Sequence, residues 1–399
     1  MTKMAIMGFG VVGSGVYDIV TKNTDTITKK IGEKLEVKYI LDIRDFSTHP
    51  GADLFVKDAD VIARDESVTL VAEAMGGVTF AYEYTKKMLM AGKSVVTSNK
   101  ELVSKKGTEL FKLAEKMGVS YMFEASVGGG IPIIRPLVNC LAANKVESIY
   151  GIMNGTTNYI LTKMFKENQS FKDALSDAQR LGYAEKDPTA DVEGFDTMRK
   201  ISILTALSAG CELDDDKIPH EGITKITAED VLCAEKMNAS VKLIGYSRIR
   251  DGKVTARVCP MIIPSDCPLY SVEDVFNAIL VTGDMVGDVM MYGRGAGKEA
   301  TASAIVGDLM DVVRHKGKFD KNFSWEEEKE GMFFEPSEEE NVFFVRCDKT
   351  KDEAKAVFGD VKFVEGASCA FITEKMTEKA FDEKADTLGG VLSKIRVYK

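Results

Sequence analysis

The segment of residues 182–200, GYAEKDPTADVEGFDTMRK, spaces carboxylates and amines so that they could move a proton. Asp196 and Lys200 are four residues apart, so on a helix their side chains would share one face. The apolar run ISILTALSAG follows at once, which predicts that this helix is half-buried. A carboxylate and an amine held there could form a proton-transfer pair. The plainer interpretation is a surface ion pair, which stabilises a helix by only about 0.2–0.5 kcal/mol.

Size and composition indicate a globular protein with a substantial core. The 399 residues suffice for two or three domains, and the net charge of -10 argues against non-specific nucleic-acid binding. No apolar run approaches the roughly 20 residues that cross a bilayer, and no separate signal segment precedes the first predicted strand. The seven cysteines are odd in number and form no CxxC motif. We therefore expect a cytoplasmic protein with free thiols and with neither membrane nor nucleic acid as partner.

A glycine motif opens the chain in the context that makes it informative. Residues 3–8 read as a buried strand, and Gly8, Gly10 and Gly13 then form GxGxxG at the start of an apolar helix. In such a loop the first glycine permits the tight turn, the second lets backbone approach a pyrophosphate, and the third lets the helix lie close to the strand. The motif predicts dinucleotide binding; the alternative is a glycine-rich turn in another α/β fold.

The end of the second predicted strand, EVKYILDIRD, is where such a domain reads the adenosine ribose. Asp42 would favour the 2′-hydroxyl of NAD, whereas Arg44 would accommodate the 2′-phosphate of NADP. Both are present, and Asp42 comes 29 positions after Gly13, later than the usual spacing of about 20. The choice between NAD and NADP stays open.

Strands and helices alternate through the first third of the chain, which predicts a doubly wound, Rossmann-type parallel sheet. We expect this dinucleotide-binding domain to span residues 1–137, with helix 298–316 returning to it. Lys100 follows a strand end, where an open parallel sheet places its ligand crevice, although a solvated lysine in a first helical turn is the alternative.

The pattern changes after residue 138. Residues 138–297 mix helices with longer strands, including a hairpin at Arg-Asp-Gly, and predict an α+β domain for substrate binding and dimerisation. Residues 320–340 are acidic and read as a linker. Residues 341–399 alternate in the order β-α-β-β-α-β, which predicts a ferredoxin-like module.

Several of these stretches together resemble homoserine dehydrogenases. The matching segments are GFGVVGSGV, SVVTSNKELV, FEASVGGGIPII, GIMNGTTNYIL, GYAEKDPTADVEGFDTMRK and GRGAGKEATASAIVGDL, in the family's order across about residues 1 to 315. The resemblance implies reversible hydride transfer from NADPH or NADH, which reduces L-aspartate 4-semialdehyde to L-homoserine on the way to threonine, methionine and isoleucine. It also implies a homodimer.

The resemblance assigns roles residue by residue. Lys200 falls on the family's proton donor, Lys100 on the second active-site lysine, and Asp196 and Glu185 on acids that bind substrate. Cofactor contacts fall on Gly8, Phe9, Gly10, Val11, Val12, Gly13, Arg44, Gly76, Ser98, Lys100, Gly182 and Gly297. A monovalent cation site for Na⁺ or K⁺, built largely from backbone carbonyls, falls on Glu124, Val127, Gly129 and Ile131. The last 60 residues resemble a shortened ACT regulatory domain, and a purely structural or dimer-stabilising role is the alternative.

Elementary chemistry agrees with these roles. Reducing an aldehyde builds negative charge on its oxygen, so a cationic acid close to that oxygen lowers the barrier. Lysine is a weak acid with an unperturbed pKa near ~10.4, which a second lysine and partial burial would lower. The ammonium of an amino-acid substrate needs carboxylates, and Glu185 and Asp196 would supply them.

Two other functions compete with this interpretation. An aspartate-semialdehyde dehydrogenase would need a reactive cysteine, and no cysteine here stands in a turn with a histidine partner. A degenerate dehydrogenase that only senses an amino acid would not need to keep Lys100, Glu185, Asp196 and Lys200 together.

Overall fold

The structure is a computed structural model that describes residues 1–398. The chain divides into two compact units, each made of three chain segments. The first unit comprises residues 1–143, 202–215 and 293–328, and the second comprises residues 144–201, 216–292 and 329 onward. One boundary between them falls inside the long helix α9 (Phe195–Ala209), between Ile201 and Ser202. None of the helices between residues 1 and 398 is long and apolar enough to span a membrane.

The first unit contains the predicted doubly wound sheet. Its six strands are parallel and stand in the order β3-β2-β1-β4-β5-β6. They are β1 (Thr2–Met7), β2 (Leu35–Leu41), β3 (Phe55–Val56), β4 (Val68–Glu73), β5 (Ser94–Thr97) and β6 (Tyr121–Met122). The order reverses between β1 and β4, and this switch point is where a sheet of this kind binds its ligand.

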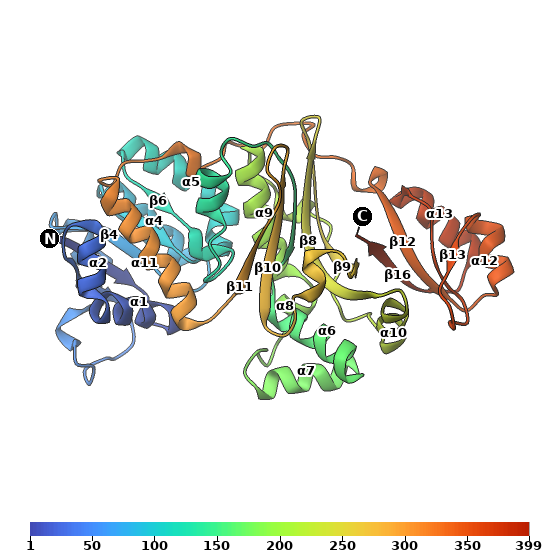
Figure 1. Ribbon diagram of the computed structural model, residues 1–399. Helices are drawn as coiled ribbons and strands as arrows, with labels where there is room; N and C mark the ends of the chain where they lie inside the picture. The colour runs from blue at the N-terminus through green and yellow to red at the C-terminus, as the bar shows by residue number, and fades with distance from the viewer. Residues whose placement is uncertain (399) are drawn as a thin grey trace. The chain divides into compact units, whose positions relative to one another are not determined.

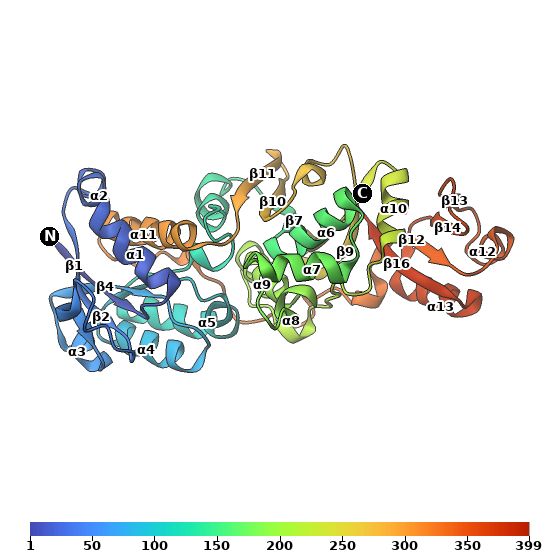
Figure 2. The same ribbon diagram turned by 90° about the horizontal axis from the view of Figure 1, so that it is seen from below.

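Helices cover both faces of this sheet, as the alternation in the sequence predicted. One face carries α1 (Val11–Lys22), α2 (Thr24–Ile31) and α11 (Lys298–Arg314), and the other carries α3 (Ala59–Arg64), α4 (Thr79–Met90) and α5 (Lys100–Met117) (Figure 2). Helix α11 packs against α1 although nearly 300 residues separate them in the chain, so the expected return of this helix to the first unit is observed.

The acidic segment 320–340 is not a plain linker, which corrects the expectation from its composition. Trp325 is 5% exposed, and its ring centroid lies 4.7 Å from that of Phe111 and 5.7 Å from that of Phe123. The segment up to residue 328 therefore belongs to the first unit, and only the remainder continues into the second. Trp325 buries a large apolar surface, and the free energy gained from this burial holds the segment against the first unit although most of its neighbours in the sequence are charged.

The second unit is built on a ten-stranded mixed sheet, whose main path runs β11-β10-β7-β8-β9-β16-β12-β14-β13. The first five strands are β7 (Val146–Ile152), β8 (Ala239–Arg250), β9 (Lys253–Pro264), β10 (Phe276–Gly283) and β11 (Gly287–Arg294). Strands β8 and β9 form the predicted hairpin, in which Asp251 and Gly252 take φ values of 51° and 76°. Such a pair of positive φ values suits a two-residue turn between antiparallel strands.

Five helices complete the middle of the second unit. They are α6 (Gly155–Glu167), α7 (Phe171–Arg180), α8 (Thr189–Val192), the start of α9, and α10 (Ala228–Lys236). Helices α6 and α10 both pack against β8, so one of the two longest strands of the sheet supports the helix that begins in the NGTTN segment.

The C-terminal residues have the predicted order of elements. The elements are β12 (Glu340–Cys347), α12 (Lys351–Phe358), β13 (Lys362–Phe363), β14 (Ala370–Ile372), α13 (Glu378–Leu388) and β16 (Val391–Val397), with a two-residue strand β15 (Met376–Thr377) added before α13. Helices α12 and α13 cover one face of these strands through Phe358 and Phe381, which pack in one core with Phe343 (Figure 1). Lys399 lies outside the described residues.

The C-terminal elements do not form a module separate from the substrate domain, which corrects the predicted boundary at residue 341. Strand β16 pairs with β12 on one side and runs parallel to β9 on the other, with Arg396 opposite Met261 and Val397 opposite Ile262. One sheet therefore continues from the middle of the unit to its end. The sequence could not show this, because an edge pairing of two residue pairs leaves no periodic signal.

A buried ion pair lies where β16 enters this sheet. The carboxylate of Glu378 accepts hydrogen bonds from Arg396 Nε at 2.7 Å and Nη2 at 2.9 Å, and the Lys394 ammonium lies 2.9 Å away. Burial alone would raise the pKa of Glu378, but the hydrogen bonds from Arg396 and Lys394 outweigh it and lower the pKa to about 2. The charged form of Glu378 therefore stabilises the folded state.

Because this pKa lies below its ordinary value of 4.5, the stabilisation should be complete above about pH 4.5 and be lost as the pH falls toward 2. We expect Glu378→Gln to lower the free energy of unfolding at pH 7 by about 1.5–3 kcal/mol, the effect of losing hydrogen bonds to a charged group, since the buried Arg396 keeps only the half-exposed Glu221 carboxylate as its anion. Urea denaturation between pH 3 and pH 7 measures both effects. The matched control is Glu340→Gln, which breaks an exposed pair with Lys375 and should shift the midpoint little. Equal shifts for the two variants would contradict the expectation.

Candidate active site

The glycine loop at the carboxyl end of β1 has the close packing that the motif predicted. Gly8 has a φ of +90°, and a Cβ atom there would lie 2.8 Å from the carbonyl oxygen of Ala74. A Cβ atom on Gly13 would lie 1.9 Å from the carbonyl oxygen of Gly8, so α1 can approach β1 only without a side chain there. Gly10 faces open space, with nothing within 4 Å of its ideal Cβ position. The N-terminus of α1 can therefore receive a phosphate group.

Asp42 and Arg44 form one ionic group beside this loop. Asp42 Oδ2 accepts the backbone N–H of Phe9 at 2.8 Å, and the Arg44 guanidinium donates to both carboxylate oxygens at 3.0 and 2.8 Å. Hydrogen bonds from Arg44 hold the pKa of Asp42 well below its usual range. The Arg44 side chain stays 57% exposed, whereas that of Asp42 is 7% exposed. Arg44 therefore offers its charge to solvent, while both oxygens of the acid are engaged.

The other predicted cofactor residues of the first unit stand at strand and helix ends. Gly76 follows β4, Ser98 follows β5, and Lys100 is the first residue of α5. Gly297 is the N-cap of α11, with a φ of 124° that favours glycine. Val11 and Val12 begin α1. Gly182 alone lies in the second unit, in an exposed turn after α7.

The side chains of Asp196 and Lys200, predicted to share a helix face, are in contact in the second unit. Lys200 Nζ lies 2.7 Å from Asp196 Oδ2 on the first turns of α9, and it also donates to the carbonyl oxygen of Met153 at 2.7 Å. Asp196 and Lys200 are each 8% exposed. The interpretation of a solvated surface pair is therefore wrong. The two groups are held out of water, where they act on each other far more strongly than at a surface.

Sequence reasoning missed Asn154, which ties this pair to α6. The Asn154 amide donates to Asp196 Oδ2 at 3.0 Å and to Asp191 Oδ1 at 2.7 Å, while its oxygen accepts the N–H of Thr157 at 2.9 Å. Asn154 is thus the N-cap of α6. Asparagine is a preferred N-cap residue, so the NGTTN turn did contain the signal.

Within residues 1–398, Glu185 makes no side-chain contact with Asp196 or Lys200. Its side chain is exposed in the loop that follows α7, and only its backbone carbonyl is engaged, by the Gln179 amide at 3.0 Å. The same loop is fastened at Tyr183, whose carbonyl oxygen accepts the Thr156 hydroxyl at 2.6 Å.

The four residues of the predicted cation site lie on one buried segment, 124–131. The Glu124 carboxylate is already occupied: it accepts the backbone N–H groups of Ile133, Ile134 and Arg135 at 2.6–2.8 Å. Only backbone oxygens would remain for a cation, as the resemblance implied. Within residues 1–398, no group of three or more His, Cys, Asp or Glu side chains is arranged to hold a metal ion.

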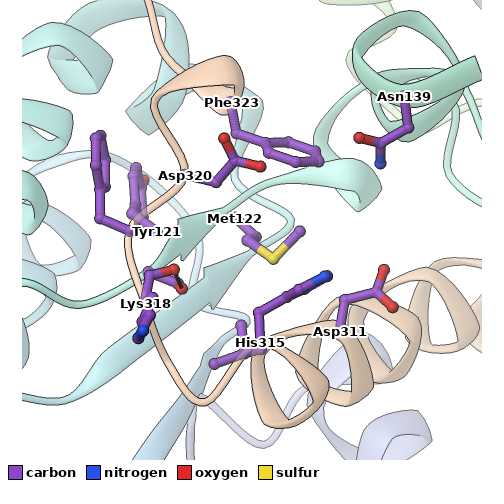
Figure 3. Close-up of a pocket in the computed structure, with 11 residues that line it drawn as sticks. Tyr121, Met122, Asn139, Asp311, His315, Lys318, Asp320 and Phe323 are labelled. Carbon is purple, nitrogen blue, oxygen red and sulfur yellow. Dashed lines mark hydrogen bonds between the residues drawn. The ribbon is translucent and has the colours of Figure 1, made fainter.

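A separate cavity of about 200 Å³ lies in the first unit, between β6, the end of α11 and the segment after it. Figure 3 shows Asp311 of α11 and His315, the C-cap residue of that helix, on one side and Phe323 on the other. None of the predicted site residues lines it, so this cavity is distinct from the glycine loop.

A parallel sheet with a glycine loop at its switch point, together with a buried lysine–carboxylate pair, defines a nicotinamide-dependent oxidoreductase. Comparison with known sequences identifies which one. Residues 8–124 match the family profile "Homoserine dehydrogenase, NAD binding domain", and residues 132–310 match the profile "Homoserine dehydrogenase". The chain belongs to the homoserine dehydrogenase family, whose members interconvert L-aspartate 4-semialdehyde and L-homoserine.

Individual relatives agree with the profiles. The homoserine dehydrogenase of Pseudomonas aeruginosa is 41% identical over 78% of this chain and 72% of its own length. That of Helicobacter pylori is 38% identical over 91% of this chain and 85% of its own. Among solved structures, a homoserine dehydrogenase from Thiobacillus denitrificans has a TM-score of 0.91 with 31% identity, covering 100% of this chain and 98% of its own. A hyperthermophilic archaeal homoserine dehydrogenase solved with NADPH has a TM-score of 0.66 with 27% identity, covering 79% of this chain and 98% of its own.

The glycine loop offers a matched pair of variants. Gly10→Ala should leave the melting temperature unchanged but raise the dissociation constant for NADPH at least about ten-fold, because the new methyl group occupies the space that a phosphate needs. Gly13→Ala should lower the melting temperature, because its methyl group would overlap the carbonyl of Gly8. Fluorescence titration with NADPH and thermal melting measure the two effects. Unchanged NADPH affinity in Gly10→Ala would argue against phosphate binding at this helix end.

Proposed function

We propose that Lys200 is the group that protonates the carbonyl oxygen of L-aspartate 4-semialdehyde and that takes the proton back when L-homoserine is oxidised. The supporting observation is its buried contact with Asp196 Oδ2 at 2.7 Å. Hydride transfer builds negative charge on the substrate oxygen, and an ammonium held in place by fixed acceptors stabilises that charge without reorganising. Asp196 and the Met153 carbonyl take two of the three ammonium hydrogens, which leaves one for the substrate oxygen.

In this proposal the carboxylates bind the amino-acid end of the substrate. Asp196 orients Lys200 and contributes negative charge for the substrate ammonium, and Glu185 supplies a second carboxylate from an exposed loop. Lys100 contributes a second cation at the substrate oxygen. Asp191 joins this set because the Asn154 amide bridges it to Asp196. The nicotinamide supplies the hydride, and the protein holds and polarises the substrate.

Lys200→Ala should lower kcat for L-homoserine oxidation by about 10²–10⁴-fold, the usual contribution of a general acid or base. Binding of NADPH, measured by fluorescence, should stay within about two-fold of wild type because the cofactor residues are untouched. The matched control is Lys163→Ala, which removes the lysine of an exposed i,i+4 pair with Glu167 on α6 and should leave kcat unchanged. If Lys200→Ala retains more than about a hundredth of wild-type kcat, Lys200 is not the proton donor.

We also propose that NADP(H) is the preferred cofactor. The carboxylate of Asp42 is engaged by Phe9 and Arg44, so it is poorly placed to accept a ribose hydroxyl. The exposed Arg44 guanidinium can turn toward a 2′-phosphate, and guanidinium groups bind phosphate in a bidentate manner.

Initial rates of L-homoserine oxidation with NADP⁺ and NAD⁺ run side by side test this preference. Arg44→Ala should raise KM for NADP⁺ by about ten-fold or more, the effect of a lost charge-assisted hydrogen bond, and should change KM for NAD⁺ by less than about three-fold. A matched loss with both cofactors would show that Arg44 supports the loop and does not read the phosphate. The control is Arg64→Ala, which breaks an exposed pair with Asp60 in the same unit.

Three further assignments complete the proposal. A monovalent cation, Na⁺ or K⁺, binds the carbonyl oxygens of residues 124–131, and replacing it by choline should slow turnover. The enzyme is a homodimer, which light scattering at micromolar concentration would test.

The C-terminal elements form an ACT-like module, supported by their strand order β16-β12-β14-β13. Unchanged rates with threonine would favour a purely structural role for these elements. The product serves threonine, methionine and isoleucine synthesis.

A further inference from the structure

Glu73 is a buried carboxylic acid that has no part in the cofactor, substrate or cation sites described above. It is the last residue of β4 and is 0% exposed. Among the described residues no cation lies within ion-pair distance of it. Burial raises the pKa of Glu73 to about 7, against hydrogen bonds from Thr97 and Met75 that lower it. A buried acid without a cation costs stability, so its presence calls for a function.

The contacts of Glu73 join the two loops that follow β4 and β5. One carboxylate oxygen accepts the backbone N–H of Met75 at 2.7 Å, and the other accepts the hydroxyl of Thr97, which lies directly opposite Glu73 in the sheet. The backbone carbonyl of Glu73 also accepts the N–H of Ser98 at 3.4 Å. A single residue thus holds the starts of both loops at the carboxyl edge of the sheet, where the proposed cofactor residues Gly76 and Ser98 stand.

The chain of hydrogen bonds continues from Thr97 to the first turn of α5. The Thr97 hydroxyl oxygen accepts the backbone N–H of Asn99 at 2.9 Å. The side-chain oxygen of Asn99 caps α5 by accepting the N–H of Leu102 at 3.0 Å, and its amide donates to the carbonyl of Gly77 at 2.6 Å. Lys100 is the next residue and the first of this helix. Its backbone position is therefore set by Asn99, which Thr97 and Glu73 hold in turn.

We propose that Glu73 is a positioning residue of the enzyme, which places Lys100 for the reaction through Thr97 and Asn99. The inference rests on the proposed role of Lys100. The proposal depends on the number of acceptors. Above the pKa of about 7, where Glu73 is ionised, two donors, the Met75 N–H and the Thr97 O–H, meet two carboxylate oxygens. An amide has one acceptor oxygen, so in Glu73→Gln one of these donors must lose its partner or face another N–H group.

The test measures kcat for L-homoserine oxidation at saturating cofactor. Glu73→Gln and Thr97→Val should each lower kcat by about ten- to hundred-fold, the effect of one buried hydrogen bond lost at a positioned group. Thr97→Ser keeps the hydroxyl and should retain kcat within about three-fold. The matched control is Thr85→Val, since the Thr85 hydroxyl is equally buried in the same unit and has no hydrogen-bond partner among the described residues. Melting temperatures identify any variant that fails to fold.

Double variants test whether Glu73 affects kcat through Thr97 and Lys100. The variant with both Glu73→Gln and Thr97→Val should be no slower than the slower single variant, because both interrupt one chain of contacts. In a Lys100→Ala background, Glu73→Gln should change kcat by less than about three-fold. Wild-type kcat in Glu73→Gln, or an undiminished loss in the Lys100→Ala background, would overturn the proposal. If Lys100→Ala alone keeps wild-type kcat, the assigned role of Lys100 fails, and the proposal that Glu73 acts through it is overturned with it. Non-additive effects of Glu73→Gln and Thr97→Val on kcat would then show only that both residues hold the same two loops.

Discussion

The buried contact between Lys200 and Asp196 is the interaction on which the middle of the second unit depends. An ammonium and a carboxylate removed from water cost several kcal/mol each unless their remaining hydrogens and lone pairs find partners. Met153 and Asn154 supply those partners, and both stand at the junction of β7 and α6. The start of α9 must therefore lie against the NGTTN turn. That requirement explains why a helix cap, a strand end and an acidic loop from distant parts of the chain converge on one place.

The same reasoning explains how this pair differs from an ion pair at the surface. A surface pair of the same spacing, such as Lys163 with Glu167, is screened by water and exchanges partners freely. Burial of Lys200 fixes its donor direction, and it removes the water that would otherwise solvate a developing oxyanion. The spacing of four residues is common to both pairs. The apolar sequence that follows Lys200 is what distinguishes them, because it draws α9 into the core.

Local chemistry made much of this structure predictable. The glycine loop, the parallel sheet and the β8–β9 hairpin follow from steric demands and periodicities that act within a few residues, as the contacts of Gly8 and Gly13 show. The pairing of β16 with β9 and the burial of Trp325 depend on partners more than a hundred residues away, and no local pattern encodes them. Asn154 lies between these cases. The residue type of Asn154 indicates a helix cap in the sequence, but its contact with Asp196 is visible only in the structure.

Three buried carboxylates show how differently the fold can use the same group. Glu378 is compensated by Arg396 and Lys394, and it fastens the C-terminal strand. Glu124 is compensated by a row of backbone N–H groups and by Arg135, and it holds the turn after residue 131. Glu73 has hydrogen-bond donors but no cation, and it stands at the carboxyl edge of the cofactor sheet. Each of the first two carboxylates has a cation beside it. The third has no cation beside it within the described chain, and burial raises its pKa to about 7. Glu73 thus lacks the cation that Glu378 and Glu124 each have, while its hydrogen bonds to Met75 and Thr97 hold the starts of two loops, which supports a role in positioning those loops.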